Sequence, residues 1–153
     1  MSIAVANLDT TISLWSVAGR TLQHRLVDLV VAAYALDFSS DGRVLAVGGA
    51  DHLVHCWNVG TWQESRTLAG QPDLVWAVAF AATNRLLISA GQDSFNPSLP
   101  THMRVWDVTA PQLLQDILLP AGVSAMVSTP DGRAIVFAGV DPSIRVWDVT
   151  PPK

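Results

Sequence analysis

The chain has 153 residues, of which 50% are hydrophobic and only 14% are charged, with a formal net charge of −4. Nine scattered Lys and Arg residues in an acidic chain argue against a nucleic-acid partner. No apolar run reaches the roughly 18 residues of a membrane-spanning helix, so no membrane association is expected. The first residues lack a signal-peptide pattern, and we expect a cytoplasmic protein.

Short runs rich in Val, Ile and Leu alternate with Gly, Pro, Asp or Asn turns, which predicts strands and no helix. The first group of predicted strands covers residues 3–6, 11–17 and 21–26. The second covers 33–38, 44–48, 53–59 and 64–68. The third covers 75–81, 86–90, 102–108 and 113–119. The fourth covers 123–128, 134–138 and 144–149.

A repeat underlies these groups. Four predicted strands have similar C-terminal sequences and each contains a Trp at the same place. These residues are separated by 42, 49 and 41 positions, and they are Trp15, Trp57, Trp106 and Trp147. An Asp precedes each Trp, by 6 residues in three repeats and by 13 in the third; these are Asp9, Asp51, Asp93 and Asp141. Without a seven-residue insertion in the third repeat, the period is about 42 residues. A period of roughly 40–45 residues is typical of a four-stranded propeller blade.

The repeats resemble the WD-repeat (WD40-type) β-propeller family. The matching segments are VWAVAF, RLLISAGQD and MRVWDV in the third repeat, and AMVSTPDGRAIVFAGVD and SIRVWDV in the fourth. The Trp-Asp pair stands at Trp106-Asp107 and Trp147-Asp148, and is replaced by Trp57-Asn58 and Trp15-Ser16.

The resemblance implies an all-β fold of β-propeller blades, each a four-stranded antiparallel sheet, with four blades in one repeat domain over residues 1–153. The expected blades span about 1–30, 31–71, 72–120 and 121–153. The first lacks its innermost strand and the fourth its outermost, so the chain is expected to be a half-propeller. We expect each repeat Trp to be structural and buried between blades.

Blades of this family often carry a Gly-His pair, whose His joins a Ser or Thr, the Trp and the hairpin Asp in a hydrogen-bonded network. Here Gly70-Gln71 stands at that place in the third repeat, and only Ser89 matches the hydroxyl position. We therefore expect an incomplete network in every blade, with stability mainly from apolar packing. Each hairpin Asp is expected to accept backbone N–H groups of its own turn.

The sequence offers little for catalysis. Cys56, next to Trp57 in a strand, is interpreted as a small buried hydrophobe rather than a nucleophile. His52 and His55 are a poor metal pair because their spacing puts them on opposite faces of a strand. The four hairpin Asp residues, one per repeat, are interpreted as turn residues. We predict no catalytic residue, no metal site and no cofactor.

Four residues are candidates for binding a peptide or protein partner: Tyr34, Trp76, Phe95 and Leu99. Tyr34, Trp76 and Ser124 begin the innermost strands, which by resemblance lie near the channel mouth where many family members bind peptides. Phe95 and Leu99 lie in the loop that holds the insertion, residues 94–101, within a hairpin that by resemblance projects on the face where family members commonly bind partners. The alternatives are packing against a neighbouring blade and a tolerated surface insertion.

Four blades leave two apolar end faces uncovered, which soluble monomers rarely tolerate. The first hypothesis is a homodimer that closes an eight-bladed ring; completion by another propeller chain and a self-closed four-bladed ring follow. The strands predicted to form the seam contribute Ile3, Val5, Ile12, Leu14, Ile135, Phe137, Ile144 and Val146, and alternation is expected to send only some of these side chains outward.

The predicted function is a non-catalytic interaction and scaffold module that needs assembly to close its ring. The alternative is a purely structural, self-associating half-propeller fragment, natural or engineered, without a ligand. An enzyme ranks third.

Overall fold

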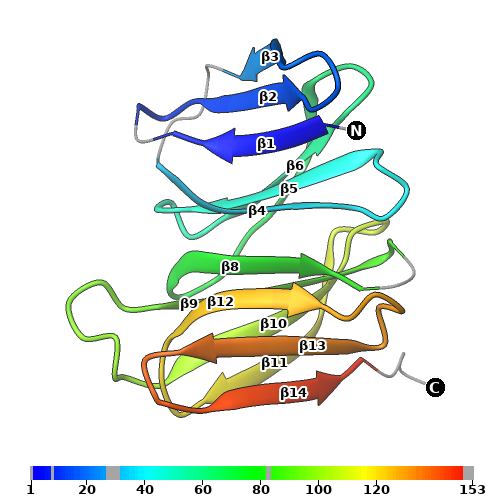
Figure 1. Ribbon diagram of the computed structural model, residues 1–153. Helices are drawn as coiled ribbons and strands as arrows, with labels where there is room; N and C mark the ends of the chain where they lie inside the picture. The colour runs from blue at the N-terminus through cyan, green and yellow to red at the C-terminus, as the bar shows by residue number, and fades with distance from the viewer. Residues whose placement is uncertain (1, 8, 27–31, 82–83, 150–153) are drawn as a thin grey trace.

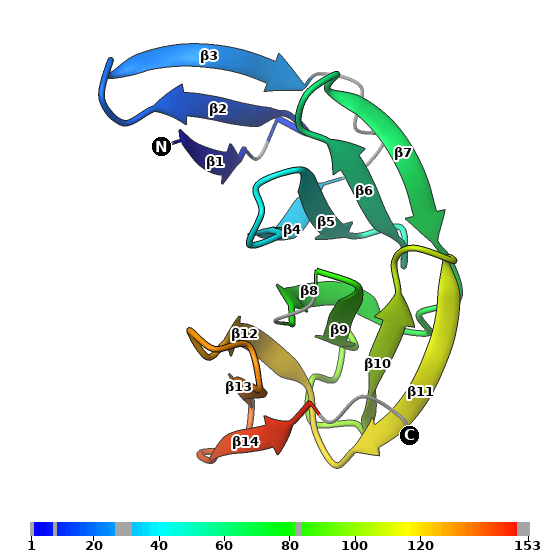
Figure 2. The same cartoon turned by 90° about the vertical axis from the view of Figure 1, so that its right-hand side faces the viewer.

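The computed structural model describes residues 2–7, 9–26, 32–81 and 84–149, and it is built from strands and turns. Within those ranges no helix is present, and therefore none that could cross a membrane. Four antiparallel sheets follow one another along the chain and are arranged in an arc (Figures 1 and 2).

Each sheet is a simple meander, and we number the sheets as blades 1 to 4. Blade 1 contains β1 (Ser2–Ala6), β2 (Ile12–Ser16) and β3 (Thr21–Leu26). Blade 2 contains β4 (Ala33–Phe38), β5 (Val44–Gly49), β6 (Val54–Asn58) and β7 (Gln63–Leu68). Blade 3 contains β8 (Leu74–Phe80), β9 (Leu86–Gln92), β10 (Thr101–Asp107) and β11 (Gln112–Leu119). Blade 4 contains β12 (Val123–Ser128), β13 (Ala134–Gly139) and β14 (Ile144–Asp148).

The predicted all-β fold of propeller blades is confirmed, and every strand end lies within two residues of its predicted position. The reason is the strength of the turn signals. Gly42 and Gly132 adopt φ of 69° and 64°, a region that glycine enters without strain. The corresponding turn of blade 3 has no glycine, and there Asn84 takes a φ of 52°, which Asn tolerates better than most residues.

In the part of the chain that the structure describes, the apolar core consists of three clusters, one between each pair of neighbouring blades. Ile12 and Leu14 of blade 1 pack with Leu45 and Val47 of blade 2. Further clusters join blade 2 to blade 3 and blade 3 to blade 4. An internal blade is therefore apolar on both faces, which explains the high hydrophobic fraction of a chain without a membrane-like segment.

Three of the four repeat Trp residues face the preceding blade. Trp57 belongs to the cluster between blades 1 and 2, Trp106 to that between blades 2 and 3, and Trp147 to that between blades 3 and 4. Trp106 is only 3% exposed, whereas Trp15 is 43% exposed. The prediction that every repeat Trp is buried between blades is wrong for Trp15, because no blade lies on that side of blade 1 in the described chain.

Candidate interaction surfaces

The outward face of blade 1 is an apolar surface, which we call the N-face; it consists of Ile3, Val5, Trp15 and Val17. Their exposed fractions run from 42% to 48%. Ile3 lies opposite Trp15 in the sheet, as Leu45 lies opposite Trp57 and Leu87 opposite Trp106. The internal equivalents Leu45 and Leu87 are completely buried. The N-face therefore carries the residue types that cover a preceding blade elsewhere in the molecule.

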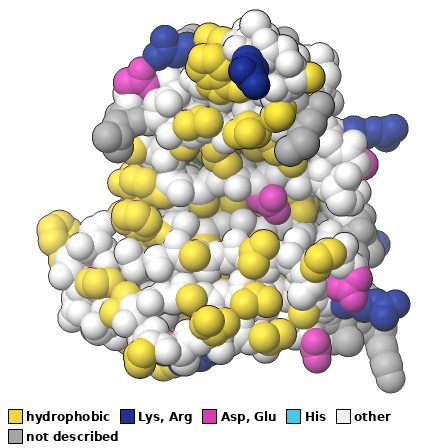
Figure 3. All heavy atoms as spheres, viewed as in Figure 1, with side chains coloured by type: hydrophobic (Ala, Val, Ile, Leu, Met, Phe, Trp, Pro, Cys, Tyr) yellow, Lys and Arg dark blue, Asp and Glu magenta, His cyan; other side chains and the backbone are white. Residues whose placement is uncertain are grey.

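The outward face of blade 4 is a second apolar surface, which we call the C-face; it consists of Val127, Val136, Ile144 and Val146. The register pairs Val127 with Val136 and Val136 with Val146, so the three side chains share one face. Exposed fractions reach 76% at Ile144 and 67% at Val146. Figure 3 shows hydrophobic side chains spread over the region of β12, β13 and β14, with few charges among them.

Four of the predicted seam residues are not on these faces. Ile12, Leu14, Ile135 and Phe137 are buried in the clusters between blades 1 and 2 and between blades 3 and 4. Successive side chains of a strand alternate between faces, and these four point toward the interior neighbour. Only Ile3, Val5, Ile144 and Val146 of the predicted set are open.

The structure brings together two of the predicted channel-mouth residues. The rings of Tyr34 and Trp76 stack with centroids 4.3 Å apart and planes 10° from parallel. Both are the extra residue of a β-bulge at the start of β4 and β8, and Ser124 holds the same place in β12. A bulge re-aims a side chain, and here it places two aromatic rings from neighbouring blades in contact. Tyr34 remains 38% exposed.

The inserted loop holds Phe95 fully in solvent, 98% exposed, and leaves Leu99 47% exposed. The loop is nevertheless anchored at both sides. Asp93 Oδ1 accepts the backbone N–H groups of Phe95 and Asn96 at 2.8 Å, and the carbonyl of Pro97 accepts Gly122 N–H at 2.9 Å. A cavity of about 150 Å³ lies beside Phe95 and is lined by residues of blades 2 and 3, including His52, Asp73 and Asp93.

The four hairpin Asp carboxylates each make the same type of hydrogen bond within their own turn. Asp9, Asp51, Asp93 and Asp141 each accept the backbone N–H of the residue two positions later, at 2.8–3.2 Å. This bond is the Asx-turn geometry that the repeat pattern leads one to expect.

Three of these carboxylates also pair with a basic side chain: Asp9 with Arg25, Asp51 with His55 and Asp141 with Arg145. Hydrogen bonds from Ser143 and Arg145 hold the pKa of Asp141 down at about 2. In blade 3 the insertion separates Asp93 from Arg104, which instead bonds Asp116 and the carbonyl of Gly70. The insertion therefore changes the charge pairing of its blade as well as the loop length.

Blade 3 contains a buried polar network that the sequence interpretation understated. Trp106 Nε1 donates to Ser89 Oγ at 2.8 Å, and Ser89 Oγ donates to Gln71 Oε1 at 2.9 Å. Gln71 Nε2 continues the chain to the carbonyl oxygen of His102 at 2.7 Å. The departure at Gly70-Gln71 is therefore partly compensated, because an amide both accepts and donates as an imidazole does. Asp93 stays outside this network, whereas Trp57 Nε1 of blade 2 is buried without a partner.

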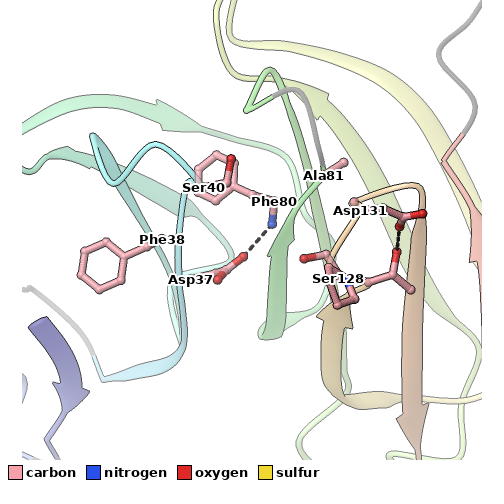
Figure 4. Close-up of a pocket in the computed structure, with 10 residues that line it drawn as sticks. Asp37, Phe38, Ser40, Phe80, Ala81, Ser128 and Asp131 are labelled. Carbon is pink, nitrogen blue, oxygen red and sulfur yellow. Dashed lines mark hydrogen bonds between the residues drawn. The ribbon is translucent and has the colours of Figure 1, made fainter. Parts of the chain in front are cut away.

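A second cavity of about 150 Å³ lies under the turns that follow β4, β8 and β12 (Figure 4). Asp37 reaches across from blade 2 and its Oδ2 accepts the N–H of Phe80 in blade 3 at 2.7 Å. Burial raises the pKa of Asp37, although the backbone N–H groups of Phe80 and Phe38 act in the opposite direction. This hydrogen bond links blades 2 and 3 through their innermost strands, β4 and β8.

The candidate reactive groups lie in structural surroundings. Cys56 is completely buried, and burial raises the pKa of its thiol to about 11. His55 lies between Asp51 and Glu64, at 2.8 and 2.7 Å. Burial lowers the pKa of His55, but the hydrogen bonds to the two carboxylates outweigh it and the net shift is upward. Among the described residues no group of three His, Cys, Asp or Glu side chains is arranged to hold a metal ion.

Comparison with known proteins places these features in a family. The model for "WD domain, G-beta repeat" matches residues 21–58, 62–95 and 118–148. Nuclear distribution protein PAC1 of Arthroderma otae is 27% identical over 161 residues, which cover 97% of this chain and 33% of that protein. Pre-mRNA-splicing factor cwf17 of Schizosaccharomyces pombe is 23% identical over 147 residues, covering 95% of this chain and 42% of that protein.

Among solved structures, the one titled "Structure of U3-55K" superposes with a TM-score of 0.81 at 25% identity. The superposed region covers 97% of the present chain and 45% of the chain in the solved structure. The chain thus spans about a third to less than half of the length of these proteins. With the family model matching most of its length, the chain belongs to the WD-repeat family of β-propeller proteins.

Proposed function

We propose that this chain is a non-catalytic interaction and scaffold module of the cytoplasm, which functions after a second protein surface has covered its two open end faces. The observation that carries this proposal is the pair of apolar faces at the ends of the arc. Ile3 is 48% exposed where its equivalents Leu45, Leu87 and Ile135 are fully buried. Val146 is 67% exposed where its equivalent Cys56 is fully buried. Surfaces of this kind mark interaction sites.

The partner that we propose for these faces is a second copy of the chain. The N-face has the residue types that cover a neighbouring blade inside the molecule, and the C-face has those that are covered. A twofold axis would place each N-face on the C-face of the other copy and close an eight-bladed ring with no apolar end left over.

A second candidate is completion by further propeller blades, either of another chain or of a longer protein. The observation that favours it is the length of the relatives, of which this chain spans a third to under a half. In that case the same two faces are covered by blades with a different sequence.

A completed ring would present a binding surface for a peptide or protein at the channel mouth. The stacked Tyr34 and Trp76 rings and the inserted loop with Phe95 and Leu99 lie at the same ends of the blades. Aromatic residues are enriched among the residues that dominate binding energy. Phe95 has no packing role that would explain an almost fully exposed ring.

The experiment that tests assembly is solution mass by light scattering at micromolar concentration. The dimer predicts twice the 16.4 kDa of one chain. Val146→Glu should dissociate it, because a charge would be buried on the C-face. Leu118→Glu is the matched control, since Leu118 is 65% exposed on the outer strand β11, away from both faces. A soluble 16.4 kDa wild-type species would overturn the dimer.

A further inference from the structure

The inserted loop leaves the carboxylate of Asp93 without the basic partner that the other hairpin Asp residues have. In blades 2 and 4 that partner, His55 or Arg145, lies four residues after the Asp. The insertion moves the corresponding residue of blade 3, Arg104, away from Asp93, and Arg104 pairs with Asp116 instead. Two backbone N–H groups occupy Asp93 Oδ1, whereas Oδ2 accepts no hydrogen bond within the described ranges of the chain.

The cavity of about 150 Å³ beside this loop is lined by hydrogen-bond acceptors. Asp73 uses only one carboxylate oxygen for structure, since its Oδ2 accepts a hydroxyl and a backbone N–H of β10 at 2.8 and 3.1 Å. His52 Nδ1 lies 3.0 Å from the carbonyl oxygen of Pro72 and donates to it, so that Nε2 of the neutral ring is an acceptor. No Lys or Arg is among the described residues that line the cavity. The complement of this lining is a cation that carries several N–H donors.

Phe95 adds an aromatic wall to the same cavity. Its ring is almost entirely in solvent, in a loop that projects beyond the neighbouring turns (Figure 1). The backbone N–H of Phe95 is bonded to Asp93 Oδ1 at 2.8 Å, which fixes the ring close to the carboxylate. The face of an aromatic ring attracts a cation, and a guanidinium does this more often than an ammonium group.

A guanidinium fits this lining better than a metal ion does. Within the described ranges, no three His, Cys, Asp or Glu side chains are arranged to hold a metal. The planar guanidinium offers five N–H donors, can bond a carboxylate through two parallel hydrogen bonds and can stack on an aromatic face. Beside Asp93 it would take the place that the Arg145 guanidinium takes beside Asp141.

We propose that the cavity beside the inserted loop binds an arginine side chain of a partner protein. The guanidinium bonds the second carboxylate oxygen of Asp93, stacks on the ring of Phe95 and is attracted by the nearby charge of Asp73. This inference rests on the proposed interaction function and names the side chain that the inserted loop recognises. A projecting loop can reach such an arginine on the surface of a folded partner.

The probe is the blocked tripeptide acetyl-Gly-Arg-Gly-amide, titrated into the full 153-residue chain. Backbone amide shifts of residues 94–96 report its binding by NMR. Replacing the arginine by citrulline, which has the same shape but no charge, should weaken binding roughly threefold or more, because the ion pair with Asp93 is lost. Added salt should weaken the arginine peptide and leave the citrulline peptide unchanged, since only the former binds through charge.

On the protein, Asp93→Asn should weaken the arginine peptide roughly three- to five-fold, while its amide oxygen still accepts the N–H groups that fix the loop. Phe95→Ala should weaken binding roughly two- to five-fold without loss of stability, because the ring packs against nothing. Asp41→Asn is the matched control and should bind as the wild type does. Asp41 also accepts a backbone N–H of its own turn, at 3.0 Å, but lies at the opposite end of β5 from the cavity.

The outcomes separate this inference from the assembly proposal. Equal affinities for the arginine and citrulline peptides, no loss in Asp93→Asn, or unchanged shifts of residues 94–96 at millimolar peptide would each overturn the arginine site. A dimer by mass with any of these results overturns the arginine site alone. A monomer that binds the arginine peptide with the expected losses overturns the dimer alone.

Discussion

Trp106 and Trp15 occupy the same register of the same repeat, yet one is 3% exposed and the other 43%. The strands that carry them, β10 and β2, pair with their neighbours in the same antiparallel order and bulge at the same place. The difference lies outside the blade, since Trp106 has blade 2 against it and Trp15 has no blade against it among the described residues. A blade of this protein is therefore completed by its neighbour, and the two end blades show what an uncompleted one exposes.

The most direct test of this difference is to replace Trp106 and Trp15 by Ala, one at a time. Trp106→Ala should cost about 3–5 kcal/mol of unfolding free energy, because it leaves a large cavity between blades 2 and 3. Trp15→Ala should cost less than about 1 kcal/mol, because the ring is nearly half in solvent. Urea unfolding measures both, in a Val146→Glu background that keeps the chain monomeric.

In the wild-type background the same Trp15→Ala change should weaken the dimer, because the N-face then contacts a C-face. Similar losses for Trp15→Ala and Trp106→Ala in the monomeric background would show that the neighbouring blade does not set the contribution of the Trp.

A second test concerns the buried network of blade 3 that links Trp106, Ser89 and Gln71. Ser89→Ala should cost about 1–3 kcal/mol, because it leaves Trp106 Nε1 and Gln71 Oε1 buried without partners. The control is Ser65→Ala, which removes a partly buried hydroxyl that makes one bond to the Cys56 carbonyl at 2.8 Å. Its expected cost is about 1 kcal/mol or less. Equal losses in urea unfolding would mean that the network adds nothing beyond single hydrogen bonds.

The sequence predicted the elements well and their surroundings less well. The strand bounds followed from turn signals such as Ser39–Gly42 and from the Asp-to-Trp spacing, which are local. The exposure of Trp15 and the burial of Ile12 and Ile135 depend instead on how blades pack. Alternation along a strand tells which residues share a face, but not which face meets a neighbouring blade.

The candidate site shows the same limit. Tyr34 and Trp76 could be aligned by repeat position, but their stacking depends on the angle between two blades, which no single strand encodes. The family motif specifies His at the position of Gln71, so the sequence alone predicts a lost hydrogen-bond partner there. The Gln71 amide supplies the acceptor and donor that the network needs, and only the geometry shows this.

The smallest expected effect is on the pH dependence of the unfolding free energy. It arises from the different partners of the hairpin carboxylates in an internal blade and an end blade. Asp51 in blade 2 is bound by a titratable partner, His55, and Asp141 in blade 4 by a permanent cation, Arg145. In the folded state, hydrogen bonds to Asp51 and Glu64 raise the pKa of His55 above the ordinary histidine value of 6.5. A group whose folded pKa is raised binds its proton more tightly in the folded state. Its contribution is therefore complete below pH 6.5 and is lost as the pH rises through the folded pKa.

His55→Arg would give blade 2 the pairing of blade 4 and should remove this pH dependence. The wild-type chain should lose up to about 1 kcal/mol relative to His55→Arg as the pH rises from about 6 to 9, which is the scale of a partly exposed ion pair. Urea unfolding across this range measures the difference, with Val146→Glu again as the monomeric host. His52→Gln is the control, because the His52 ring is exposed and its Nδ1 contacts the Pro72 carbonyl rather than a carboxylate. If wild type and His55→Arg keep a constant difference over the range, His55 has the same pKa in the folded and unfolded chains, and its contacts with Asp51 and Glu64 do not favour the protonated ring.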